Sequence, residues 1–319
     1  MLIGLTPLKA LHSDPRISYS LYIPPTHYNP DPKRVVPSPE SSGEGEDPPH
    51  PSYQRPLLPL LISIHGTHRD AASCRRRLIH FADTERCAVL APLFPAGLDD
   101  ELDLDSYKLL RSPSLRSDVA LLDIVREVAV RYPGIKTEEF FLVGFSGGGQ
   151  FVHRFLYLYP ERVLAASIGA PGRVTHLDRA AKWPLGVADV GEIFGEALSA
   201  SGGEVDLDAM RKINEVQMIV GGDDVSIPDE EFYEWVKKVM GKTPKSTTGS
   251  MEPMRCTRVE TLRKLHEEWS SLGIKTMFTV VDGLKHDSNG LHPEVEKFLT
   301  PWLRHWWLSK DIADKPLDQ

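Results

Sequence analysis

Short apolar runs recur along the chain, and each is bounded by glycine, proline or polar residues. Ile17 to Ile23 alternates apolar and polar side chains, a pattern typical of an early antiparallel strand. Leu57 to Ile64 is almost continuously apolar, as expected for a strand covered on both faces. We expect further strands at residues 87–93, 140–143, 163–168, 216–220 and 276–281.

Segments with helical periodicity lie between these predicted strands. Apolar residues recur at helical spacing from Asp118 to Tyr132, which predicts an amphipathic helix with Ser117 as its N-cap. We expect further helices over 71–82, 150–158, 230–240, 258–272 and 295–307. The alternation of strands and helices predicts an α/β fold, with a mostly parallel central sheet and helices on both faces.

Three stretches interrupt the alternation. Residues 29–56 are rich in Pro, Ser, Gly, Glu and Asp, so we expect a flexible surface loop there. Too little apolar surface precedes that loop to fold alone, and we therefore predict one domain over residues 1–319. Residues 172–211 are longer than a simple crossover, which predicts a small cap insertion. Residues 244–253 lack periodicity and are expected to form another surface loop.

Composition narrows the range of functions. The chain has 319 residues, 41% of them hydrophobic and 26% charged, which is ordinary for a globular protein. Its net charge of −8 argues against a nucleic-acid partner. No apolar run is long enough to span a membrane, and the N-terminus lacks the pattern of a signal peptide. Three cysteines without a CxxC pair indicate neither a disulfide framework nor a zinc site, so we expect a cytoplasmic protein.

One glycine-rich motif carries chemistry. Residues 144–148 read Gly-Phe-Ser-Gly-Gly and lie between a predicted strand and a predicted helix. A strained turn of small residues in this context presents a serine hydroxyl above the sheet, so Ser146 is a candidate nucleophile. The alternative is a glycine-rich turn in which Ser146 only caps the helix.

At this motif the chain resembles the α/β-hydrolase fold family, especially its esterase and depolymerase-like branches, and the resemblance covers nearly all of the chain after residue 17. It implies a catalytic acid after a later strand and a histidine after the last strand. Asp224 takes the acid position, with Asp223 as the alternative. His286 takes the position of the base, whereas His292 is expected to be structural.

The same resemblance implies an oxyanion hole. The run His-Gly-Thr at 65–67 ends the strand from which the family draws one donor, so the backbone N–H groups of Thr67 and Gly147 would bind the oxyanion. Thr67 replaces a glycine of the His-Gly-Gly-Gly version found in lipases and esterases. A mechanism of this kind requires no metal and no organic cofactor.

Substrate choice is predicted to lie in the cap. Trp183 is a candidate for an apolar wall and Arg173 for a contact with a substrate carboxylate, although ordinary packing and a solvated charge are the alternatives. The leading hypothesis is hydrolysis of a small-molecule carboxylic ester or thioester through an acyl-serine. One alternative is a biosynthetic hydrolase or cyclase that acts on a polyketide-derived intermediate, since the chain is somewhat similar to α/β-hydrolases encoded beside fungal polyketide synthases. The others are a peptidase and a non-catalytic binding protein on this scaffold.

Overall fold

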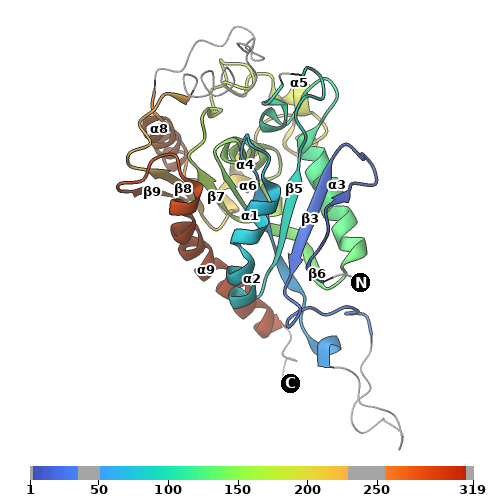
Figure 1. The fold of residues 1–319 in the computed structure, drawn as a ribbon. Coiled ribbons are helices and arrows are strands. Elements are labelled where there is room, and N and C mark those ends of the chain that lie inside the picture. The colour runs from blue at the N-terminus through green and yellow to red at the C-terminus, as the bar shows by residue number, and fades with distance from the viewer. Residues whose placement is uncertain (1–2, 35–50, 102, 229–255, 314–319) are drawn as a thin grey trace, which may run out of the picture.

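A computed structural model describes residues 3–34, 51–101, 103–228 and 256–313, and a central sheet organises them (Figure 1). Its strands are β1 (Gly4–Leu5), β2 (Lys9–Ala10), β3 (Ser18–Ile23), β4 (Leu58–Ile64), β5 (Ala88–Leu93), β6 (Ile135–Phe145), β7 (Val163–Gly169), β8 (Val216–Gly221) and β9 (Thr276–Val281).

Within the described residues the sheet has nine strands in the order β1-β3-β5-β4-β6-β7-β8-β9, with β2 paired to β3. All pairs from β5 to β9 in this order are parallel, whereas β1, β2 and β3 add antiparallel at one edge. Strands β4 and β8 are buried along their whole length, as expected of largely apolar strands that are covered on both faces. The predicted mostly parallel α/β sheet is therefore confirmed.

Helices cover both faces of this sheet. The helices are α1 (Ala71–Arg77), α2 (Ile79–Glu85), α3 (Ser117–Arg131), α4 (Gly147–Leu158), α5 (Val190–Phe194), α6 (Leu207–Lys212), α8 (Arg258–Ser271) and α9 (Ser288–Ala313), and short 3₁₀ turns lie at η1 (Pro51–Gln54), η2 (Ser106–Leu109), η3 (Pro160–Arg162) and η4 (Ser199–Ser201). Helices α1, α2 and α9 lie on one face, which is nearer the viewer in Figure 1, and α4 packs on the other. Helix α8 contacts α4, since the Trp269 indole donates to the Tyr157 hydroxyl at 3.1 Å.

Several element boundaries differ from the sequence prediction. Ser117 is not the N-cap of α3 but its first residue, and its hydroxyl donates to the Tyr107 carbonyl instead. The single helix expected over 71–82 is divided at Leu78 into α1 and α2. Helix α9 begins at Ser288 rather than 295, and the Asp287 carboxylate accepts backbone N–H groups of its first turn.

The interrupting stretches are only partly described. The helix predicted over 230–240 and the loop over 244–253 lie outside the described residues, as do residues 35–50 of the predicted loop. The end of that loop forms η1, and the Asn29 side chain donates to the Tyr53 and Arg55 carbonyls there. Residues 172–211 contain α5, η4 and most of α6. No helix in the described ranges is both long and apolar enough to cross a bilayer.

Candidate active site

Ser146 lies on a strained turn between β6 and α4. Its backbone φ is +56°, in the left-handed region that side-chain-bearing residues rarely adopt, and its N–H donates to the Gly169 carbonyl at 2.8 Å. The strand and helix approach so closely that a Cβ on Gly144 would lie 2.4 Å from the backbone of Gly148. The flanking glycines are therefore required by the turn that presents the serine.

Asp224 and His286 come together from the loops after β8 and β9. Nδ1 of His286 donates to Oδ2 of Asp224 at 2.7 Å, and the carboxylate is only 1% exposed. Asp223 instead is exposed to solvent, and its N–H donates to the Leu284 carbonyl. Of the two aspartates offered by the sequence, Asp224 is the one that contacts the histidine.

Arg258, at the start of α8, binds the other oxygen of the Asp224 carboxylate. Its guanidinium donates to Oδ1 of Asp224 at 2.8 Å and is itself 5% exposed. Burial by itself would raise the pKa of Asp224, but the hydrogen bond and charge of His286 and the charge of Arg258 outweigh it and lower that pKa. The carboxylate is thus held ionised. Sequence reasoning missed Arg258, because a basic residue at the start of a helix carries no signal of its partner.

Ser146 and His286 line the same cavity, which has a volume of about 580 Å³. The His286 ring lies 4.6 Å from the ring of Phe145, the residue before the serine. Because Nδ1 is bonded to Asp224, Nε2 is the ring nitrogen that is left for another partner. Thr67 lines this cavity as well.

Two backbone N–H groups lie beside the serine. A Cβ on Gly147 would be 3.1 Å from the backbone nitrogen of Thr67, so the two residues are in close contact. Gly147 is the first residue of α4, where the N–H has no partner within the helix. In the described part of the chain, the Thr67 N–H donates no backbone hydrogen bond. Neither N–H group therefore has a backbone partner among the described residues.

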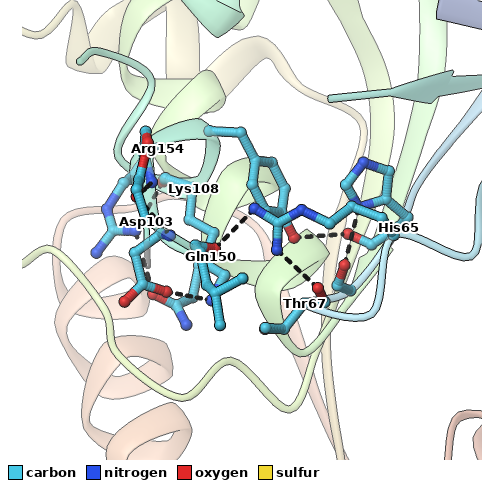
Figure 2. Close-up of polar contacts among 12 residues, drawn as sticks. His65, Thr67, Asp103, Lys108, Gln150 and Arg154 are labelled. Carbon is cyan, nitrogen blue, oxygen red and sulfur yellow. Dashed lines mark hydrogen bonds and ion pairs between the residues drawn. The ribbon is translucent and has the colours of Figure 1, made fainter. Parts of the chain in front are cut away.

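A buried network holds the loop that carries Thr67 (Figure 2). The His65 ring donates from Nδ1 to the Gly66 carbonyl at 2.8 Å and accepts the Phe94 N–H on Nε2 at 3.0 Å. Burial lowers the pKa of His65 to about 3, so the ring is neutral, as these two bonds require. The Tyr107 hydroxyl donates to the His65 carbonyl, and a guanidinium from Arg69 donates to that of Thr67.

Buried charges continue this network beneath α4 (Figure 2). Lys108, 3% exposed, forms an ion pair with Asp105, and the Asp103 carboxylate accepts the Asp105 N–H. Arg154 is fully buried and donates to the Lys108 carbonyl at 2.8 Å and to Gln150. Burial lowers the pKa of Arg154 to about 9, which leaves it charged at pH 7. The sequence offered no signal for these residues, since an isolated Lys or Arg usually lies in solvent.

The residues predicted to bind substrate lie elsewhere. The Trp183 indole donates to the Leu109 carbonyl at 3.0 Å and its ring is 5.0 Å from that of Phe194. Neither Trp183 nor Arg173 is among the described residues that line the cavity, and the same holds for the rest of 172–211. His292 lies within α9, 3.2 Å from the Glu296 carboxylate, and does line the cavity.

We found no cluster of three or more His, Cys, Asp or Glu side chains placed to hold a metal ion within the described ranges. Ser146 shares its cavity with His286, which is bonded to Asp224, and with Thr67, whose backbone nitrogen lies close to Gly147. These are the parts that a nucleophilic serine requires.

Comparison with solved structures identifies the fold. The chain is similar to a poly(aspartic acid) hydrolase from Sphingomonas sp. KT-1, with a TM-score of 0.61 and 17% identity over 93% of this chain and 98% of the other. A poly(3-hydroxybutyrate) depolymerase from Bordetella parapertussis has a TM-score of 0.61 at 18% identity, covering 93% and 90% of the two chains. An S-formylglutathione hydrolase from Agrobacterium tumefaciens has a TM-score of 0.54 at 13% identity, covering 95% and 99%.

No protein-family model and no curated protein matches the sequence. The structural similarity nevertheless extends over almost the whole chain, and the strand order and the turn at Ser146 agree with it. The chain has the α/β-hydrolase fold, in the form found in esterases and depolymerases.

Proposed function

We propose that this protein is a serine hydrolase that cleaves a carboxylic ester or thioester through an acyl-serine intermediate. Ser146 is the nucleophile, His286 the general base and acid, and Asp224 the orienting carboxylate. The observation that carries the proposal is the 2.7 Å bond from Nδ1 of His286 to a buried, ionised Asp224, in a cavity shared with Ser146. The fold similarity to esterases and depolymerases supports it.

The reaction begins with attack of Ser146 Oγ on the substrate carbonyl carbon, while its proton passes to Nε2 of His286. The negative charge that develops on the carbonyl oxygen is stabilised by the N–H groups of Thr67 and Gly147. His286 then gives its proton to the departing alcohol or thiol, which leaves the acyl group bound to Ser146.

Hydrolysis of the acyl-serine uses the same groups in reverse. His286 accepts a proton from an incoming water molecule, whose oxygen attacks the acyl carbon, and then returns the proton to Ser146 Oγ as the carboxylic acid leaves. Asp224 stabilises the imidazolium in both halves of the reaction and keeps the Nδ1 proton in place. Every proton is transferred between substrate, water and these residues.

Labelling with a fluorophosphonate probe tests the proposal. We expect covalent labelling of the wild type, none of Ser146→Ala, and strongly reduced labelling of His286→Ala. Equal labelling of Ser146→Ala would overturn the nucleophile assignment. If no form is labelled and no ester is hydrolysed, the chain is a binding protein on this scaffold.

A panel of aryl esters, thioesters and aryl amides with a common acyl group then defines the substrate class. We expect turnover of the esters and thioesters and little of the amides, which a peptidase would cleave. A cyclase acting on a polyketide-derived intermediate would be recognised by a cyclic product in place of the free acid.

A further inference from the structure

The cavity extends from Ser146 into the space between the sheet and its helices. On the sheet side it is lined by Ser63, Val143 and Ser167, which are paired side by side on β4, β6 and β7. They are 7%, 7% and 1% exposed, so this part of the cavity is deep inside the protein. Ile219 on β8 continues the lining and is fully buried.

The helices on this face leave a gap over β6. Helix α1 packs on β4 and β5, and α9 packs on β7 and β8 (Figure 1). A row of small side chains between two helices leaves space that larger residues would fill. Ser146 follows β6 directly, so the gap ends at the serine hydroxyl.

Beyond the residues that line the cavity, α9 contacts α2. Arg304 pairs with Glu85 at 2.7 Å there, and the Trp307 indole donates to the Glu85 carbonyl. Near the rim of the cavity, the Arg77 guanidinium donates to the Ser288 hydroxyl at 2.9 Å, which links α1 to α9. The pocket therefore lies between α1 and α9 and reaches Ser146 at the end of β6.

The deep walls carry no charge. They are formed by Cys74 on α1 and by Leu291, His292 and Val295 on α9. Burial lowers the pKa of His292 to about 4 and raises that of the Cys74 thiol, so both side chains are neutral at pH 7.

The charged residues of the lining lie at its edge. Apart from Arg258, which pairs with Asp224, they are exposed at the rim: Asp70, Arg77 and Asp287.

We propose that this pocket, defined by Ser63, Val143 and Ser167 below and by α1 and α9 at its sides, binds the acyl group of the substrate. The proposal rests on the serine-hydrolase function above. A pocket between the sheet and its helices suits the group that stays attached to Ser146 while the leaving group departs and water enters. The whole cavity, of which this pocket is a part, has a volume of about 580 Å³, within the roughly 300–1,000 Å³ of small-molecule sites.

The preferred substrates are accordingly esters of uncharged, mainly apolar acids of medium length, with an acyl group much larger than acetyl. Each methylene buried in such a pocket strengthens binding of the transition state by about fourfold. A terminal carboxylate on the acyl group would be excluded, because a charge in the neutral interior would have no partner.

Kinetics with p-nitrophenyl acetate, octanoate and the half-ester of suberic acid test this assignment. We expect kcat/KM for the octanoate to exceed that for the acetate by at least about tenfold. The suberate ester, with the same chain length and an added carboxylate, is expected to react at least about 100-fold more slowly than the octanoate. Ser63→Ile fills the pocket and should reduce the octanoate-to-acetate ratio at least about tenfold. The matched control Ser63→Ala removes only the hydroxyl and should keep the ratio.

The outcomes separate the two proposals. A wild type that hydrolyses the acetate as well as the octanoate, or a Ser63→Ile ratio equal to that of Ser63→Ala, overturns the acyl pocket while the hydrolase function stands. Absence of turnover and of fluorophosphonate labelling overturns the function itself.

Binding provides a readout without turnover. By calorimetry, methyl octanoate should bind the Ser146→Ala protein, and should bind Ser146→Ala/Ser63→Ile at least about tenfold more weakly. Equal binding to both would contradict the pocket even if the Ser63→Ile enzyme proved inactive.

Discussion

Replacement of Arg258 by methionine tests whether the Arg258–Asp224 ion pair contributes more to the stability of the fold than to catalysis. The side chains of Arg258 and Asp224 are 6% and 0% exposed, and their closest atoms are 2.8 Å apart. Methionine keeps most of the aliphatic volume but removes the guanidinium from Oδ1. Oδ2 keeps its hydrogen bond to His286.

The structure gives the size of the effect. At an effective dielectric constant of about 20, unit charges at this separation attract by about 6 kcal/mol, and desolvation of both groups opposes much of that attraction. Removing one partner of a buried pair lowers the free energy of unfolding by about 3–5 kcal/mol, because the other charge stays buried. We expect a loss in this range for Arg258→Met at pH 7, measured by urea denaturation.

The loss should depend on pH in a defined direction. The pKa of Asp224 is lower in the folded protein than the value of about 3.9 in an unfolded chain. Its ionisation therefore stabilises the fold above about pH 4, and this contribution disappears as the pH falls through the folded pKa. The Arg258 guanidinium is one cause of that low pKa. The difference in the free energy of unfolding between wild type and variant should therefore become smaller below about pH 4.

The same substitution should have only a small effect on kcat/KM, although its effect on the free energy of unfolding is large. Because His286 stays oriented by Asp224, we expect kcat/KM of Arg258→Met to fall by about tenfold at most, whereas Asp224→Asn should lose about 10⁴-fold. A matched control is Arg179→Met, which breaks an exposed pair with Glu204 and should change stability by about 1 kcal/mol or less. If Arg258→Met were as stable as Arg179→Met, or as inactive as Asp224→Asn while folded, the reasoning would be refuted.

Three further substitutions test the site. Asp223→Asn should leave kcat/KM within about threefold of wild type, against the large loss for Asp224→Asn, and a reversed order would exchange their roles. Gly147→Ala would place a Cβ 2.5 Å from the Tyr107 hydroxyl, so we expect kcat to fall about 100-fold by displacement of the oxyanion donor, with fluorophosphonate labelling slowed in parallel. His65→Leu removes the acceptor of the buried Phe94 N–H and should lower the free energy of unfolding by about 1–3 kcal/mol in urea; an unchanged value would contradict the network.

The sequence was sufficient for those features that depend on neighbouring residues. Period-two and period-3.6 patterns predict the alternation of strands and helices, and the glycines around Ser146 predict the turn that the structure contains. Boundaries were less predictable. Ser117 has the right chemistry for an N-cap, but its hydroxyl donates to the Tyr107 carbonyl instead of capping the helix. Ser117 is the first residue of the helix.

Contacts between distant residues that belong to no motif were not predictable. Arg258 meets Asp224 across 34 positions and Arg154 meets Lys108 across 46, and neither pair has a local pattern. The pocket was hidden for a related reason. Ser63 sits inside an apolar run, and only the strand register places it beside Val143 and Ser167 between two helices. Trp183, by contrast, is a candidate for an apolar wall because it is apolar and lies in the predicted cap, and in the structure its ring packs against Phe194.

The pocket between α1 and α9 also links the thermal stability of the fold to the size of the acyl group that the protein accepts. Side chains lining an unfilled space lack contacts that a close-packed interior would supply, so residues that fill it should raise the melting temperature as they shorten the accepted acyl group. A bound acyl ligand would supply the same contacts reversibly: at 100 times its dissociation constant it adds about 2.7 kcal/mol to the free energy of unfolding. The protein should accordingly be most resistant to heat when its substrate pocket is occupied.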